Sequence, residues 1–343
     1  MANIMLNEVC NLRCPYCFAD EFVNKNPKEI SIEDFKTALE FSLSSGHNER
    51  IGLIGGEPTL HSNFREILVM LINDSRVNNV TIFTNGIRIV DFIDEICHPK
   101  IHLLINCNSP KNMGLTNYKK MVDNIDYMIS KRYLKDKITL GINMYKPDFD
   151  YDYILELLEK YRLKSIRTSI SVPNESAYIS EPLNYFSLMK PRVLEFFDKL
   201  GSKGIVPFFD CNAMPTCIWT EDERRDTLKK FPSSDKRTNI FNFIVSCTPI
   251  IDILPDLTII RCFGLSEQTK KHLTDFKNIE DARNYYYHTI DAFSCNSIHS
   301  EKCTTCYERE VGKCNGGCLC FKINQIEKIM SYCSSLTHNK NEG

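Results

Sequence analysis

The sequence lacks an excess of charge of either sign. Its 343 residues include 42 Lys and Arg against 44 Asp and Glu, which leaves a formal net charge of −2, and no basic stripe runs along the chain. Binding to the phosphate backbone of nucleic acids depends on clustered positive charge. We therefore do not expect nucleic acid among the partners of this protein.

Long apolar runs and targeting signals are missing as well. No stretch is long and apolar enough to span a bilayer, so we expect no membrane association. The first residues contain no basic region, extended apolar segment or small-residue cleavage site of the kind that marks a secretory signal. These absences favour a cytoplasmic protein, in a compartment that keeps thiols reduced.

Cysteine, in contrast, is abundant, with 16 residues in the chain. In a reducing compartment cysteines serve metals or catalysis more often than disulfides. The chain is long enough for one large domain and a smaller one, and its 43% apolar content is ample for a core. The composition therefore predicts a globular protein that binds metal through its thiols.

Up to about residue 203, short β-rich runs alternate with helical patterns. Predicted helices include 32–45, with Ser31 as the N-cap, and 118–131. Each of six predicted strands is followed by a helical pattern: 4–6, 51–54, 80–83, 102–105, 138–142 and 166–171. This alternation predicts an α/β fold with a parallel sheet, in which loops at the carboxyl ends of the strands carry the chemistry.

Three cysteines follow the first predicted strand on one short loop. Cys10, Cys14 and Cys17 have C-x3-C-x2-C spacing, and Tyr16 directly precedes the last of them. Iron–sulfur clusters are normally held by four cysteines, so a three-cysteine site leaves one iron free to bind another ligand and do chemistry. The spacing therefore predicts an enzyme. A partial zinc site, completed by a distant His or Cys, is the alternative.

A glycine turn, Gly55-Gly56-Glu57-Pro58, follows the second predicted strand. Two glycines let backbone groups approach a ligand closely, and a carboxylate accepts a charge-assisted hydrogen bond from an ammonium group. Taken alone, the segment would be read as an ordinary tight turn. Its position at the end of the second strand, after a cysteine loop at the end of the first, favours a binding role.

In this order the two motifs resemble the radical S-adenosylmethionine (SAM) family, whose first motif is C-x3-C-x-Φ-C with an aromatic residue at Φ. The resemblance implies a partial (β/α)6 TIM-like barrel and a [4Fe-4S] cluster on the three cysteines that binds SAM. The glycine turn would bind the methionine amino group. Contacts to the ribose and carboxylate of SAM are implied for polar residues after three later strands, although each is also an ordinary polar loop residue: Asn85, Asn108, Ser109 and Asn143.

Residues 204–343 are predicted to form a second, cysteine-rich domain, after a linker at 201–204 that separates it from a first domain at 1–203. Its cysteines resemble the seven-cysteine pattern of the SPASM subfamily of radical SAM enzymes. The resemblance implies two auxiliary [4Fe-4S] clusters. The implied ligands of the first are Cys247, Cys262 and Cys318, completed by Cys217, Cys211 or Cys320 or left open to substrate, and those of the second are Cys303, Cys306, Cys314 and Cys333.

The match to this pattern has two departures. Leu257 stands where the subfamily usually has glycine, and seven residues instead of five separate Cys306 from Cys314. A structural zinc ribbon built from the cysteines between 303 and 318 is the alternative, but it leaves Cys247, Cys262 and Cys333 unexplained. The cysteines at positions 97, 107 and 295 are expected to be small buried hydrophobic residues.

The resemblance implies that SAM is cleaved to methionine and a 5′-deoxyadenosyl radical, which abstracts hydrogen from an unactivated carbon. Family members with the extended cysteine pattern mostly modify peptides or proteins. We therefore predict an oxygen-sensitive oxidoreductase that installs a thioether or carbon–carbon crosslink, or an epimerised residue, in a ribosomally made peptide. An electron donor such as flavodoxin or ferredoxin is expected. Because the barrel begins within the first few residues, we also expect a separate leader-recognition protein or leader-independent binding.

Three other functions remain open from the sequence. One is maturation of a redox-cofactor peptide, and another is sulfatase maturation under anaerobic conditions. Sulfatase-type maturases carry an aspartate immediately after the second cysteine of the extended pattern, where this chain has Phe263. The third is a non-catalytic cluster or zinc protein that binds a partner, and the intact cysteine loop and Glu57 argue against it.

Overall fold

The computed structural model describes most of the first 209 residues and several later segments. The described residues are 2–20, 22–47, 49–171, 182–209, 214–231, 250–292, 300–312, 314 and 318. Within them, no helix combines the length and the apolar character needed to cross a membrane. Several cysteines considered as cluster ligands lie outside the described residues: Cys211, Cys247, Cys320 and Cys333.

One sheet of ten strands organises the described residues, in the order β10-β9-β8-β1-β2-β3-β4-β5-β6-β7. Neighbouring strands from β8 through β1 to β7 are parallel, whereas β9 pairs antiparallel with both β8 and β10. The predicted α/β fold with a mostly parallel sheet is thus confirmed. The strands are β1 Ala2–Met5, β2 Glu49–Ile54, β3 Val77–Thr84, β4 Ile101–Asn106, β5 Ile138–Met144, β6 Ser165–Ile170, β7 Val206–Phe209, β8 Ile251–Ile253, β9 Thr258–Ile260 and β10 Lys271–His272.

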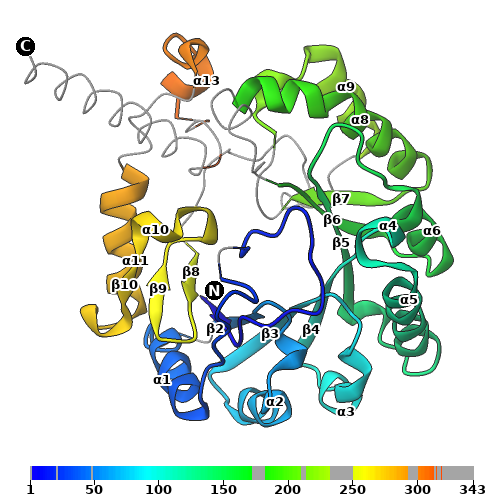
Figure 1. The fold of residues 1–343 in the computed structure, drawn as a ribbon. Coiled ribbons are helices and arrows are strands. Elements are labelled where there is room, and N and C mark those ends of the chain that lie inside the picture. Colours follow the sequence, from blue (N-terminus) through cyan, green and yellow to red (C-terminus); the bar gives the residue numbers. More distant parts are fainter. Residues whose placement is uncertain are drawn as a thin grey trace, which may run out of the picture.

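The strands curve around the segment that follows β1, and the helices that connect them lie on the outer side of the curve (Figure 1). The helices are α1 Ile32–Ser42, α2 Phe64–Asn73, α3 Ile93–Ile96, α4 Pro110–Met113, α5 Leu115–Ser130, α6 Asp152–Lys160, α8 Pro182–Ser202, α9 Glu221–Lys230, α10 Ser266–Thr269, α11 Ile279–Tyr286 and α13 Tyr307–Glu310. Four short 3-10 helices bear on the sites below: η1 Pro58–Leu60, η4 Thr216–Ile218, η5 Phe263–Leu265 and η8 Glu301–Cys303.

The hydrophobic core lies between the sheet and this outer layer of helices. Phe35 of α1, Leu68 of α2 and Ile125 of α5 are fully buried, as are Leu53 and Ile82 of the strands they cover. Helix ends follow local sequence signals: the Ser31 hydroxyl accepts a hydrogen bond of 3.0 Å from the Asp34 amide, which is the predicted N-cap of α1. Helical spacing of apolar residues and this cap together explain α1.

The sheet continues past the boundary expected at residue 203. Strand β7 pairs with β6, and β8, much later in the chain, pairs with β1 on the other side of the sheet. The predicted linker at 201–204 is also shorter, because α8 runs to Ser202 and Gly204, with φ +63°, provides the turn into β7. The six predicted strands are therefore only part of the sheet. The division at 203 stays a prediction, but the sheet itself is not divided there.

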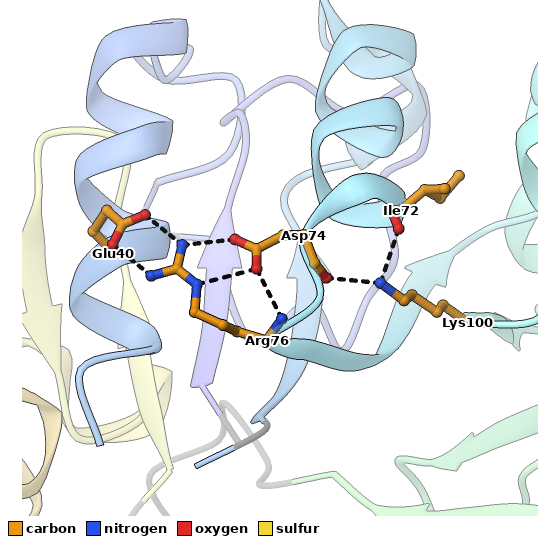
Figure 2. A network of polar contacts seen from close by, with 5 residues as sticks. All are labelled: Glu40, Ile72, Asp74, Arg76 and Lys100. Atoms are coloured by element: carbon orange, nitrogen blue, oxygen red, sulfur yellow. Dashed lines mark hydrogen bonds and ion pairs between the residues drawn. The ribbon is translucent and has the colours of Figure 1, made fainter. Parts of the chain in front are cut away.

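An ion-pair network holds the amino ends of β3 and β4, opposite the end where the chemistry is expected (Figure 2). The guanidinium of Arg76 binds both carboxylate oxygens of Glu40 on α1, at 2.8 and 2.6 Å, and also contacts the Asp74 carboxylate. Lys100 donates to the backbone carbonyls of Ile72 and Asp74 at the end of α2. Two helices and two strands are thereby joined at the base of the sheet.

A buried carboxyl group lies where the late strand β8 joins β1. Asp252 faces Asn3 in register, and the Asn3 amide donates to its carboxylate at 2.7 Å. A Cβ atom at Gly52 would lie 2.0 Å from the Asn3 side-chain oxygen, so only glycine leaves room for this side chain. Burial raises the pKa of Asp252 from 3.8 to about 7, since the hydrogen bond from Asn3 and the charge of Arg261 only partly offset the loss of water.

This raised pKa predicts a specific pH dependence of stability. Protonated Asp252 makes its full favourable contribution to the free energy of unfolding below about pH 4. This contribution is lost as the pH rises through about 7, because the folded state then carries a buried charge. Asp252→Asn removes that cost, and its amide also supplies a donor for the Asn3 oxygen, which has no partner. Thermal unfolding should show the variant to be more stable than the parent at pH 8, with a smaller difference at pH 5.5.

Asp256→Asn is the matched control. Asp256 lies on the surface, where the Lys28 ammonium donates to its carboxylate at 2.8 Å and lowers its pKa despite partial burial. Its replacement should cost about 0 to 1 kcal/mol at pH 8 and stabilise the protein at no pH. An effect of Asp252→Asn that is the same at both pH values would contradict the assignment of a titrating buried carboxyl group.

Candidate active site

The three cysteines of the first motif lie on the loop that leaves the carboxyl end of β1. All three are partly buried. Burial is the largest cause that raises the pKa of the Cys10 thiol to about 11 and that of Cys14 to about 12. The Cys17 amide donates to the Cys14 carbonyl at 3.1 Å, and the Leu12 amide donates to the Cys10 sulfur at 3.4 Å. The three cysteines therefore share one tight loop, and their role as cluster ligands stays a prediction.

This arrangement fits a polynuclear cluster better than a single ion. Among the described residues, no three Cys, His, Asp or Glu side chains converge closely enough to hold one metal ion. A zinc ion would draw its thiolates to about 2.3 Å, whereas in a four-iron cluster each thiolate binds a different iron. The raised pKa values mean that the thiols keep their protons until a positively charged centre displaces them.

The glycine turn is bonded directly to the backbone of the cysteine loop. The amide of Gly56 donates to the carbonyl of Asn7, and that of Glu57 donates to the carbonyl of Val9, both at 2.8 Å. A Cβ atom at Gly56 would lie only 2.4 Å from the Val9 carbonyl oxygen, so the approach of these two backbones requires glycine. The two motifs are thus one unit at the ends of β1 and β2.

The carboxylate of Glu57 is buried inside this unit, with 1% of the residue exposed. One oxygen accepts from the hydroxyls of Thr59 and Thr84, at 2.6 and 2.7 Å, and the other accepts from the Asn85 amide at 2.8 Å. Loss of water raises its pKa, and these hydrogen bonds oppose the rise. These contacts give the carboxylate a structural part in the turn, beside the contact with an ammonium group that the sequence analysis expects.

Tyr16 connects the cysteine loop to the carboxyl ends of β4 and β5. Its hydroxyl donates to the side-chain oxygen of Asn108, and its ring packs at 5.0 Å from that of Tyr145. Burial raises the pKa of Tyr16, while a hydrogen bond with Asn143 acts in the opposite direction. Asn108 also bonds to the Cys14 thiol and lowers the pKa of that group. Two of the predicted SAM contacts therefore touch the cysteine motif.

A cavity of about 280 Å³ opens beside Tyr16 at this end of the sheet. Its walls carry both signs of charge, and its lining includes the predicted contacts Ser109 and Asn143 together with Lys111, Lys146, Asp148 and Asp150. Asn85 lies outside this cavity lining, where its side-chain amide donates to Asn11 of the cysteine loop at 2.7 Å. Of the four predicted contacts, Ser109 and Asn143 therefore line the cavity, whereas Asn85 and Asn108 do not.

Comparison with known proteins identifies the first part of the chain. Residues 4–131 match the radical SAM superfamily. These residues form a radical SAM domain. The chain is also similar to the mitochondrial GTP 3′,8-cyclase of Arabidopsis thaliana, with 39% identity over 88 residues, which are 25% of this chain and 22% of that protein. An uncharacterized protein of Methanocaldococcus jannaschii is 27% identical over 210 residues, 58% of this chain and 70% of that one.

Solved structures show the same fold over a longer part of the chain. SuiB of Streptococcus suis, bound to precursor peptide SuiA, superimposes with a TM-score of 0.58 over 92% of this chain and 71% of that one, at 15% identity. Similarity at this identity shows the fold alone. The matched region is less than two thirds of the length of the first cyclase relatives, at 22% to 34%.

Apart from Cys318, which is partly buried against the hydrophobic core, the described cysteines beyond the radical SAM domain fall into two places. Cys262 precedes η5, and the ring of the next residue, Phe263, packs at 4.9 Å from Phe18, directly after Cys17. The second place is a cavity that is lined by Cys217, Cys303, Cys306 and Cys314. Cys217 was assigned from the sequence to the first auxiliary set, but the structure places it with three cysteines of the second.

Leu257, which stands where the SPASM pattern usually has glycine, has a left-handed backbone conformation. Its φ is +63°, in the left-handed region that glycine favours, within the turn between β8 and β9. The amide of Leu257 donates to the Leu254 carbonyl at 3.0 Å, and the Leu254 amide donates to Thr258 at 2.8 Å. The departure from the SPASM pattern at this residue therefore leaves a left-handed turn intact.

Sequence reasoning missed several residues that hold the radical SAM site together. They are Asn7, Asn11, Thr59 and Tyr145. Each is an ordinary polar or aromatic residue beside a motif, so no spacing marks it. Position was the available signal, because all lie within a few residues of a predicted strand end.

We predict that Glu57 positions the turn and does not bind SAM directly. Glu57→Gln keeps an oxygen for the Asn85 amide and can donate to the threonine hydroxyls, so it should cost only about 1 kcal/mol of stability. Glu57→Ala leaves these groups unpaired beside a cavity and should cost about 2 to 5 kcal/mol. Urea unfolding measures both costs, and equilibrium binding of SAM to the reconstituted protein measures the affinity.

The Gln variant separates the two roles. If the carboxylate only positions the turn, SAM affinity should stay within about threefold of the parent. The reason is that Glu57→Gln removes the charge of the side chain but preserves its shape. A stable Gln variant with affinity lowered more than about tenfold would show a direct contact with the SAM ammonium.

Proposed function

We propose that this protein is a radical SAM enzyme that modifies a peptide or protein substrate. The observation that supports this most is the joining of three thiols, the glycine turn and a cavity at one end of the sheet. The [4Fe-4S] cluster would be held by Cys10, Cys14 and Cys17, and with SAM it would supply an organic radical able to take hydrogen from an unactivated carbon.

The residues of the chain have separate parts in this proposal. The cysteine loop holds the cluster, and the turn presents its backbone to the methionine end of SAM while Glu57 keeps the turn in place. Tyr16, Asn108 and Asn143 line the path from the cysteines to the cavity. Because Tyr16 and Asn108 are mostly buried, they also keep water from the reacting centre.

A peptide substrate is favoured by the chain's second half and by the cavity. The seven-cysteine pattern resembles that of peptide and protein maturases, and SuiB, which shares the fold, has been solved with a precursor peptide. The cavity pairs Lys146 with Asp148 at 3.3 Å and carries Lys111 and Asp150 as well. Balanced charge of this kind suits a peptide backbone with mixed side chains. The bond formed, a crosslink or an epimerised centre, belongs to the same proposal.

Our proposal also includes the partners and the setting inferred from the sequence. It comprises two auxiliary clusters, an electron donor such as flavodoxin or ferredoxin, a separate leader-recognition protein and a cytoplasmic location. Phe263 remains the argument against a sulfatase-type maturase, since an apolar ring buried against Phe18 cannot act as a base.

The second candidate function is GTP cyclisation, favoured by 39% identity to the Arabidopsis thaliana GTP 3′,8-cyclase. That match covers only 25% of this chain. A triphosphate carries several negative charges and calls for clustered Arg or Lys. The two aspartates of the cavity work against such binding.

SAM cleavage tests the enzyme assignment without knowledge of the substrate. Anaerobically reconstituted and chemically reduced protein should release 5′-deoxyadenosine and methionine, detected by chromatography and mass spectrometry. Cys14→Ala should reduce this to the background without protein, since the cluster loses one of three ligands. Cys97→Ala is the matched control and should keep parental activity, because Cys97 lies at the amino end of β4, by Arg132. Equal loss in both variants, or equal retention, would contradict the proposed site.

A comparison of substrates distinguishes the two candidate functions. We expect 5′-deoxyadenosine release to rise when a peptide encoded beside the gene is added, together with a mass change in that peptide. GTP should neither raise the release nor be consumed. GTP-dependent release with formation of a cyclised nucleotide would replace the peptide proposal by the cyclase one.

A further inference from the structure

Four cysteines from two distant segments line one cavity outside the radical SAM site. Cys217 comes from η4, next to the end of the parallel sheet, whereas Cys303, Cys306 and Cys314 come from the segment around η8 and α13. The rest of the lining comprises Leu183, Pro215, Thr216, Glu308 and Arg309. Between Cys217 and Cys303 lie 85 residues of sequence, so only the fold brings these thiols together.

All four line the same cavity, and Cys217 is exposed at its edge, so its thiol is accessible to an incoming metal centre.

We propose that Cys217, Cys303, Cys306 and Cys314 together bind an iron–sulfur cluster, with Cys217 as the fourth thiolate. Four cysteine thiolates are the usual ligand set of a [4Fe-4S] cluster. A single zinc ion held by the same four thiolates is the alternative that iron and sulfide analysis distinguishes. This assignment differs from the resemblance to the SPASM pattern, which gives the fourth place to Cys333.

The surroundings of the cavity suit a centre with net negative charge. Arg309 lines it and donates to the Cys303 carbonyl at 3.4 Å, so a cationic side chain borders the cavity. Leu183 and Pro215 form an apolar wall. Four thiolates outweigh the charge of the iron and sulfide core, so a nearby cation stabilises the loaded site.

The chain next to Cys217 packs against α8 and leads directly into α9. Two residues later, Trp219 is 6% exposed and stacks on Phe197 of α8, with ring planes only 10° apart. Thr220 then begins α9 with a capping box to Glu223. A cluster bound through Cys217 would therefore fasten the later cysteine segment to the parallel sheet.

Iron content of double variants tests whether Cys217 and Cys303 serve the same cluster. All variants carry Ala at positions 10, 14 and 17, so that iron and sulfide report only on other sites after anaerobic reconstitution. Cys217→Ala and Cys303→Ala should each remove about four irons per chain. The double variant should lose no more than either single variant, because both ligands belong to one cluster.

Two further variants make the test specific. In the variant that combines Cys262→Ala with Cys303→Ala, the iron losses of the two single variants should add, as expected for two separate clusters. Cys333→Ala should retain the iron that Cys217→Ala loses. Added losses in the Cys217 and Cys303 double variant would overturn the proposal, as would full retention of iron in Cys217→Ala. Zinc without sulfide in the parental protein would overturn the cluster assignment.

Differential alkylation provides a test in the unsubstituted protein and does not depend on variants that fold. Iodoacetamide followed by mass spectrometry should find Cys217 and Cys303 protected together in the reconstituted protein. Removal of iron by a chelator should expose both with the same time course, while labelling of Cys97 should not change. Labelling of Cys217 at full iron content would contradict the proposal. Neither readout requires SAM cleavage, so failure of the proposed enzymatic function would leave this test intact.

Discussion

Two backbone hydrogen bonds hold the cysteine loop against the glycine turn, from Gly56 to Asn7 and from Glu57 to Val9. They join the carboxyl ends of β1 and β2, and their short reach is possible only because residue 56 has no side chain. The loop that carries Cys10, Cys14 and Cys17 therefore cannot move independently of the turn. Any ligand held between them meets a surface whose shape is already formed.

Glu57 extends this unit to the next strand. Its carboxylate accepts from Thr84 and Asn85 at the end of β3, and Asn85 in turn donates to Asn11 of the cysteine loop. The result is a closed ring of contacts through three strand ends. Arg76 and Lys100 fasten the opposite ends of β3 and β4, so the strands that carry the site are held at both ends.

How far the sequence predicted this structure depends on the kind of signal. Apolar runs located all six predicted strands, because parallel strands buried on both faces leave a continuous pattern. Strands β8 to β10 are only two or three residues long, which is too short for any period to show. The cysteine and glycine motifs marked the site, yet the inward role of Glu57 depends on Thr59 and Thr84, and no spacing rule connects those residues.

The same reasoning explains why the sequence pattern groups Cys217 with Cys247, Cys262 and Cys318, whereas in the structure it lines a cavity with other cysteines. Sequence patterns order cysteines along the chain, whereas ligation depends on which loops the sheet brings together. Strand β7 carries the chain to η4 on one side of the sheet, and β8 pairs with β1 on the other, with Cys262 soon after it. Cys262 therefore lies beside the first cysteine loop, through Phe263 and Phe18, while Cys217 meets the segment that begins at Cys303. One sheet thus carries Cys262 and Cys217 to different places, and the order of the strands decides which cysteines lie near each of them.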